Sequence, residues 1–284
     1  MNKKLKARLD GLYKTFDLAF LATDPLEFVH NYDDPGDREI AGLVASSLAY
    51  GRVDTIKKSV AKVMDKAGAH PAEFVRRFDP VKGKALFDGF VHRFNNGDDI
   101  ACLLWFARQM IEESGSIGGF FMKGYSLGHR NIKEALSVFS KNVLSLDSSA
   151  VYGEKSLHPK AGVRFFFPDP EDKSPCKRLN LYLRWMVRRD RLDFGQWEGV
   201  DPAKLVMPLD THIARISRNI GLTRRASPDW KMAEEITEAL KALDPSDPVK
   251  YDFALCRLGI LDKCPRTADA LKCESCLIGD ICVL

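Results

Sequence analysis

The chain of 284 residues lacks a hydrophobic run long enough to cross a membrane. A transmembrane helix needs about 20 consecutive, mostly apolar residues. The N-terminal segment begins with basic residues but lacks the apolar stretch of a signal peptide, because Asp10, Lys14 and Asp17 interrupt it. We therefore expect a cytoplasmic protein that has no membrane partner.

The alternation of apolar and polar residues that marks a half-buried β-strand is scarce in this sequence. Glycine and proline, with 20 and 14 residues, are too few for a collagen-like or low-complexity chain. Apolar residues recur instead at helical spacing, beginning with Leu5, Leu9 and Leu12. The sequence thus predicts an all-α fold with an irregular stretch over Ser145–Pro175. The predicted helices are Arg38–Ala67 with a break at Tyr50–Arg52, Pro71–Phe78, Ile100–Glu113, Ile132–Leu144, Cys176–Arg191, Asp210–Ile220, Trp230–Leu243 and Pro248–Leu258.

Positive charge is concentrated in one part of the chain, although the net charge is only +4. The segment Cys176–Arg225 holds eleven Lys or Arg residues and five Asp or Glu residues, which is a net +6. A local excess of basic residues is typical of a surface that binds a polyanion such as nucleic acid. A solvated helical face without a partner is the alternative explanation.

Cysteine is crowded at the C-terminal end, where five of the seven residues fall within the last 29 positions. Cys264, Cys273, Cys276 and Cys282 form the pattern C-x8-C-x2-C-x5-C. Soft thiolate ligands at such spacing bind zinc or an iron–sulfur cluster. Because there is one C-x2-C pair rather than two, a [4Fe–4S] cluster fits better, with zinc as the alternative. Cys256 lies within a predicted helix and is interpreted as a core residue, or as a reserve ligand.

An aspartate stands directly before a predicted helix in the segment Met207–Leu222, where Asp210 is followed by Thr211, His212 and Arg215. A carboxylate at a helix N-terminus caps backbone N–H groups and is kept ionised by the helix dipole. Such a charge can stabilise a cationic sugar during cleavage of an N-glycosidic bond. A plain N-cap is the alternative.

The cysteine pattern and the Asp210 segment together resemble the endonuclease III-like iron–sulfur DNA glycosylases. That family ends all-α chains with four cysteines separated by six, two and five residues, and carries a V-D-T-H-[IV]-x-R segment. Here the first gap is eight residues. The resemblance implies a two-lobed helical fold, a [4Fe–4S] cluster held by the four cysteines, and catalysis by Asp210.

The sequence has no counterpart of that family's L-P-G-V-G hairpin turn. In its place, Lys177 opens a predicted helix and Asn180 follows, which is similar to the family's K-T-A-N-V-V-L helix. The 33 positions between Lys177 and Asp210 resemble the long spacing of archaeal 8-oxoguanine glycosylases. The resemblance therefore implies Lys177 as the nucleophile, base excision repair as the process, AP-lyase activity as an accompanying reaction, and 8-oxoguanine as one candidate base.

A set of basic, aromatic and polar residues is predicted to contact DNA, the expected partner, in the form of a damaged duplex. These residues are Tyr50, Arg52, Arg178, Arg184, Arg188, Trp197, His212 and Arg215. Trp197 and the run Phe165–Phe167 are candidate surfaces on which an everted base would stack. No obligate protein partner is evident.

The resemblance divides the chain into a lobe of residues 1–35 and 205–284 with the cluster, and a helical bundle of residues 36–204. Lys177 and Asp210 would face a cleft between these lobes. Two rival functions stay open. One is an N-glycosidase that acts on RNA or nucleosides, and the other is a non-catalytic iron–sulfur protein that binds nucleic acid.

Overall fold

The computed structural model describes residues 3–261, 263–265, 267 and 269–283. The contacts of the chain divide it into two units. Unit 1 comprises Met1–Phe20, Lys173–Gly195 and Asp201–Leu284, and unit 2 comprises Leu21–Asp172 and Gln196–Val200. This division differs from the predicted boundaries, because the segment after Lys173 joins the terminal helices. Lys177 and Asp210 therefore belong to the same unit.

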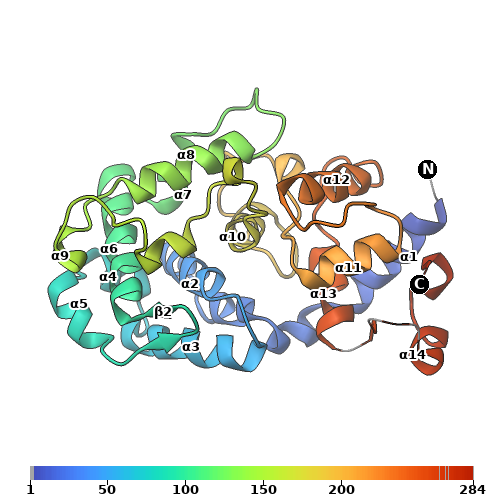
Figure 1. Cartoon of the computed structure of the whole chain (residues 1–284), viewed down its shortest axis with the longest axis horizontal. Coiled ribbons are helices and arrows are strands. Elements are labelled where there is room, and N and C mark those ends of the chain that lie inside the picture. The colour runs from blue at the N-terminus through green and yellow to red at the C-terminus, as the bar shows by residue number, and fades with distance from the viewer. Residues whose placement is uncertain (1–2, 262, 266, 268, 284) are drawn as a thin grey trace. The chain divides into compact units, whose positions relative to one another are not determined.

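Unit 1 is built entirely from helices and their connections in its described residues (Figure 1). Its helices bury Leu9, Trp185 and Ile216 completely. The helices are α1 (Lys3–Thr15), α10 (Lys177–Val187), α11 (Thr211–Asn219), α12 (Trp230–Lys241), α13 (Asp252–Ile260) and α14 (Ala270–Glu274).

Unit 2 is a second helical body that contains the long helix α6 (Gly97–Ser114) in its core. A β-hairpin of two short antiparallel strands, β1 (Val91–His92) and β2 (Asn95–Asn96), precedes α6. The remaining helices are α2 (Pro35–Ser47), α3 (Val53–Ala67), α4 (Pro71–Arg76), α5 (Pro80–Leu86), α7 (Ile117–Met122), α8 (Lys133–Leu144) and α9 (Ser149–Tyr152).

The prediction of an all-α fold is confirmed for the described residues, in which β1 and β2 are the only strands. The predicted break at Tyr50–Arg52 separates α2 from α3. Helix α10 ends at Val187 rather than at Arg191, because the chain turns back there and Arg189 forms an antiparallel bridge with Phe194. Helices α5 and α7 were missed, since each is short and contains glycine. Within the described chain, no helix combines the length and apolar character needed to cross a membrane.

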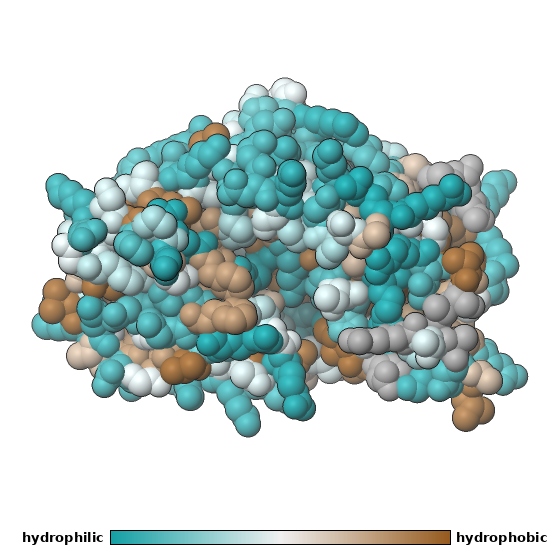
Figure 2. Space-filling model, viewed as in Figure 1, coloured by the Kyte–Doolittle hydropathy of each residue, from teal (hydrophilic) through white to brown (hydrophobic). Residues whose placement is uncertain are grey.

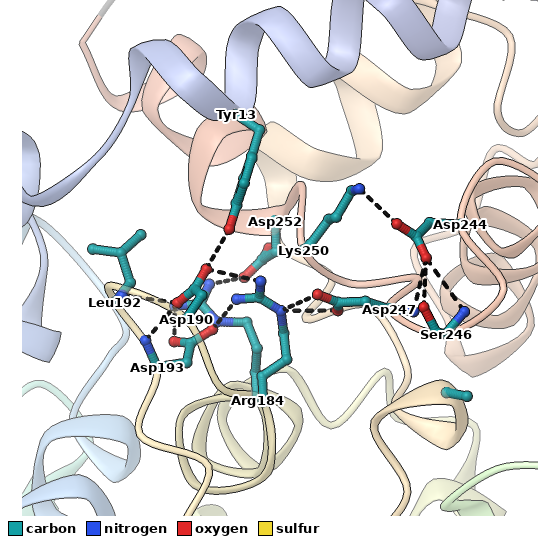
Figure 3. A network of polar contacts seen from close by, with 12 residues as sticks. Tyr13, Arg184, Asp190, Leu192, Asp193, Asp244, Ser246, Asp247, Lys250 and Asp252 are labelled. Atoms are coloured by element: carbon teal, nitrogen blue, oxygen red, sulfur yellow. Dashed lines mark hydrogen bonds and ion pairs between the residues drawn. The ribbon is translucent and has the colours of Figure 1, made fainter.

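Two arginines of α10 lie inside unit 1 in a network of ion pairs (Figure 3). Arg184 is 2 % exposed and pairs with Asp193, at 3.2 Å, and with Asp252. Arg188 is 3 % exposed and pairs with Asp193, Asp190 and Asp247. The prediction that Arg184 and Arg188 contact DNA is therefore wrong, because both guanidinium groups are buried and bound to carboxylates.

The network joins segments that are far apart in the sequence. Asp190 accepts a hydrogen bond from the Tyr13 hydroxyl of α1 at 2.7 Å, and Asp247 accepts two from Arg188 at 2.8 and 2.9 Å. Burial opposes ionisation of Asp190, but Arg188 and its hydrogen-bond donors outweigh burial and lower its pKa to about 2. The arginines of α10 thus hold α1, α10 and the segment before α13 together.

Removal of one arginine from this network should destabilise the protein strongly. We expect Arg188→Ala to lower the free energy of unfolding by about 3–5 kcal/mol, because it leaves buried carboxylates without a counter-charge. Chemical denaturation measures this loss, and the matched control is Arg191→Ala, since Arg191 is exposed. A loss as small as that of the control would contradict the structural role of Arg188.

Candidate functional site

Asp210 is the N-cap of α11, as the sequence predicts. Its Oδ1 accepts hydrogen bonds from the backbone N–H groups of His212 and Ile213, both at 2.8 Å. Its Oδ2 accepts a hydrogen bond from the thiol of Cys256 on α13, at 3.6 Å. The carboxylate is only partly buried, so that one oxygen caps the helix and the other lies toward α13.

Helices α11 and α13 approach each other closely beside this carboxylate. A Cβ atom at Gly259 would lie 2.2 Å from Nδ1 of His212, so only glycine leaves room for the imidazole. Burial lowers the pKa of His212; Asp210 raises it, and Arg215, Lys177 and Arg257 lower it further. The lowered pKa favours the neutral imidazole of His212, which packs against α13, and its contact with DNA stays a prediction.

Lys177 is the first residue of α10 and is partly buried. The preceding residue, Cys176, has a left-handed backbone conformation with φ of 46°. The charge of Lys177 acts on His212, Cys256 and Asp252, and the charge of Asp210 acts on the same three groups. The sequence-predicted pair of Lys177 and Asp210 thus contributes to one electrostatic environment within unit 1.

The four C-terminal cysteines lie in one short segment whose ends are tied to the helices of unit 1. Arg215 of α11 donates hydrogen bonds to the carbonyl oxygens of Cys264 and Pro265. Val283 donates its N–H to the Asn219 carbonyl at 2.8 Å, and Arg8 of α1 pairs with Asp280. Arg215 therefore anchors the cysteine segment, and its contact with DNA stays a prediction.

The thiols of this segment are close enough to influence one another. Burial raises the pKa of Cys264; Arg215 lowers it, and the thiols of Cys276, Cys282 and Cys273 raise it. A Cβ atom at Gly279 would lie 2.8 Å from the Cys273 carbonyl, so the turn after Cys276 needs glycine. In the described part of the chain, no group of three or more His, Cys, Asp or Glu side chains has the arrangement of a metal site. Four soft thiols in this segment still form the donor set that suits iron–sulfur or zinc binding.

An aromatic surface lies on unit 2, formed by Tyr50, Phe94 and Phe165. Figure 2 shows hydrophobic side chains grouped over the β1–β2 hairpin on a face that is otherwise largely hydrophilic. Phe94 is 70 % exposed and Phe165 is 39 % exposed. The Tyr50 and Phe94 rings are parallel with centroids 6.3 Å apart, and Phe165 meets both rings edge-on. The guanidinium of Arg93 lies 5.5 Å from the centroid of the Phe94 ring.

Buried hydrogen bonds hold this aromatic surface in place. The Tyr50 hydroxyl donates to the His92 carbonyl at 2.8 Å and to Oδ1 of Asn95 at 2.6 Å. Asn95 in turn donates to Asp99 of α6 at 3.0 Å. Gly51, with φ of +106°, lies against the Arg93 side chain, where a Cβ atom would be 3.1 Å from it. These hydrogen bonds connect the Tyr50 ring and the β1–β2 hairpin to α6.

The other predicted contacts have mixed outcomes. Arg52 is exposed at the N-cap of α3, two residues after Tyr50, so it is available to a ligand of this surface. Arg178 is only 9 % exposed, which speaks against a contact with phosphate. Phe166 and Phe167 are buried in the core, and only Phe165 of that run is exposed.

Trp197 lies within unit 2 and is 7 % exposed. Its indole N–H donates to the buried carboxylate of Glu39 at 2.6 Å, and its ring stacks on Phe121. It also lines a cavity of about 390 Å³ together with Glu39 and Arg76. A role of Trp197 in base binding stays a prediction. The observed contacts of Trp197 give it a structural role, in which it attaches the segment 196–200 to the rest of unit 2.

Sequence reasoning missed three residues that contribute to these sites: Arg93, Phe94 and Cys256 as a partner of Asp210. The two-residue turn between β1 and β2 was the available signal for Arg93 and Phe94, but strands of two residues are too short to show alternation. No sequence pattern reveals the contact between Cys256 and Asp210, because they are 46 positions apart.

Comparisons with known proteins give a family but no function. No curated protein and no solved structure matches the chain. Residues 24–261 match a family described as "Protein of unknown function (DUF2400)", and this match ends before the four C-terminal cysteines. Since the match covers most of the 284 residues, the chain belongs to the DUF2400 family.

Proposed function

We propose that this protein is a DNA glycosylase that removes a damaged base, with 8-oxoguanine as a candidate, and then cleaves the abasic site as a lyase. The observation that carries the proposal is that Asp210 caps α11 and Lys177 opens α10 within the same unit. An amine and a carboxylate are the two groups that nucleophilic cleavage of an N-glycosidic bond requires.

In the proposed reaction, the amine nitrogen of Lys177 attacks C1′ of the damaged nucleotide. The electron pair of the C1′–N bond leaves with the base, which takes up a proton, while the amine loses one. Asp210 stabilises the positive charge that develops on the sugar. Opening of the sugar ring then gives an iminium, or Schiff base, between Lys177 and C1′. β-Elimination from this species breaks the DNA strand on the 3′ side.

The proposed cofactor is a [4Fe–4S] cluster bound by Cys264, Cys273, Cys276 and Cys282, with zinc as the alternative. When bound, such a cluster supplies a rigid cross-link between thiolates rather than a chemical step in base removal. The support is the donor set and the anchoring of its segment by Arg215 and Asp280. This segment would thus be held against α1 and against α11, the helix that Asp210 caps.

The aromatic surface of Tyr50, Phe94 and Phe165 is proposed to contact bases that have lost their stacking partners. We expect Phe94→Ala to weaken binding to a duplex with an abasic site about 5- to 150-fold, since one base–aromatic stack contributes about 1–3 kcal/mol. Fluorescence anisotropy measures this effect, and Val91→Ala on the same hairpin is the control because Val91 is also exposed. Equal affinities for both variants would exclude Phe94 from the interface.

The proposed function is tested by release of a base from duplexes that each carry one lesion. The panel contains 8-oxoguanine, thymine glycol, uracil and an undamaged control. We expect release at one lesion, and a rate about 10²- to 10³-fold lower for Asp210→Asn, which removes the charge but keeps the helix cap.

Asp229→Asn is the matched control, because Asp229 caps α12 with nearly the same backbone angles and lies outside the proposed site. Absence of release from every duplex would reject the DNA glycosylase. The same assay on RNA and on free nucleosides then tests the rival N-glycosidase, and retained binding without release favours the non-catalytic alternative.

A further inference from the structure

The thiol of Cys256 lies between two charged groups in unit 1. Its Sγ is 3.6 Å from Oδ2 of Asp210, and Nη2 of Arg257 is 3.8 Å from the same sulfur. Arg257 is buried and its guanidinium also lies 4.5 Å from the centroid of the Phe253 ring. The sulfur is therefore held in place on α13 by the residue that follows it.

The thiol of Cys256 is protonated and can therefore donate a hydrogen bond. Burial raises the pKa of Cys256, and Asp210 raises it further, whereas Arg257 lowers it. The thiol therefore keeps its proton at neutral pH and has a proton to donate toward Oδ2. The charges of Lys177 on α10 and of Asp252 on α13 also act on this thiol.

The two oxygens of Asp210 have different partners. Oδ1 accepts from two backbone N–H groups, which fixes the cap, while Oδ2 has the thiol as its donor. A thiol is a weak donor, so it orients Oδ2 and leaves most of its negative charge available to a ligand.

We propose that Cys256 is a positioning residue, which orients the reactive oxygen of Asp210 through its S–H group. This inference rests on the proposed function for its catalytic consequence, but the contact itself can be measured in the protein without a substrate. It also assigns Cys256 to Asp210 rather than to the four cysteines of the C-terminal segment.

The first measurement is the S–H stretching band of Cys256, taken as the infrared difference between wild type and Cys256→Ala in the full chain. We expect a band at low wavenumber, because a carboxylate is a strong acceptor. In Asp210→Asn, the amide oxygen of the asparagine should still accept the two backbone hydrogen bonds that cap α11. Its NH₂ group then faces the sulfur of Cys256, which loses its acceptor. The band should then move to higher wavenumber, and an unmoved band would overturn the proposal.

The second measurement is the single-turnover rate of base release. Cys256→Ala should lower this rate about 10-fold with unchanged DNA affinity, and Cys256→Ser, which keeps a donor, should stay within about threefold of wild type. Cys102→Ala is the control, because Cys102 is a buried thiol in the core of unit 2.

A purely structural role of the sulfur predicts a different pattern, in which the serine variant is as slow as the alanine variant. That result would overturn the proposal even if the infrared band moves. If the wild-type protein releases no base at all, the proposed function has failed. The infrared band alone then decides whether the thiol holds Asp210.

Discussion

Lys177→Gln should abolish the covalent adduct that borohydride traps between this protein and lesion-containing DNA. Borohydride delivers a hydride to the iminium carbon and converts the Schiff base into a stable secondary amine. Glutamine has no amine to form that iminium, so we expect a complete loss of the adduct on denaturing gels. The residue lies at the start of α10, where this substitution removes a charge without opening a cavity in the core.

The matched control is Lys173→Gln, four residues earlier in the same unit, because Lys173 is exposed. This variant should form as much adduct as wild type. An adduct that persists in Lys177→Gln would assign the nucleophile to another amine. If Lys177→Gln still releases the base but forms no adduct, Asp210 would activate water instead, and the enzyme would be monofunctional.

Cys276→Ala should remove the cluster from the protein. Cys276 belongs to the C-x2-C pair, so its loss deprives the centre of one of four thiolates. We expect wild type to contain about four iron atoms per chain and to show a broad visible absorption band. The variant should contain less than about one iron atom per chain and be colourless.

Cys102→Ala serves as the control here as well, since it removes a cysteine but leaves the C-terminal segment intact. Unchanged iron in Cys276→Ala would show that a different set of ligands holds the cluster. A colourless wild type with about one zinc atom per chain would select the zinc alternative. Absence of both metals would remove the cofactor from the proposal.

The anchoring of the cysteine segment predicts how its loss affects the rest of unit 1. Arg215 donates to carbonyl oxygens of this segment and lies on α11, the helix that Asp210 caps. Loss of the metal would therefore disturb the hydrogen bonds of Arg215 rather than the helix cap formed by Asp210. The rate of base release by the metal-free protein reports on the Asp210 site, whereas the iron content reports on the cysteine segment.

The helical character of this protein is determined by local sequence. Apolar residues at a spacing of three and four, as in Leu5, Leu9 and Leu12, favour a helix whatever lies opposite them. The cap at Asp210 is likewise local, because its acceptor and its donors are two and three residues apart. The same argument covers the break at Tyr50–Arg52 between α2 and α3.

Only the tertiary structure determines which of the basic residues are buried and which are exposed. Arg184 and Arg188 form a regular basic stripe in the sequence, which is also the pattern of a surface that binds nucleic acid. Their carboxylate partners include Asp247, 59 positions after Arg188, and Asp252, 68 positions after Arg184, and no local pattern connects them. A count of charges cannot tell a paired, buried guanidinium from one that is exposed.

The chemistry-bearing residue types, an aspartate cap, a helix-initial lysine and four clustered cysteines, can be read from the sequence by itself. Which side chains surround them depends on how helices pack. Gly259 admits His212 between α11 and α13, and the same approach brings Cys256 to Asp210. These contacts arise between residues that are distant along the chain, because packing is set by the joint shape of several helices rather than by the periodicity of any one of them.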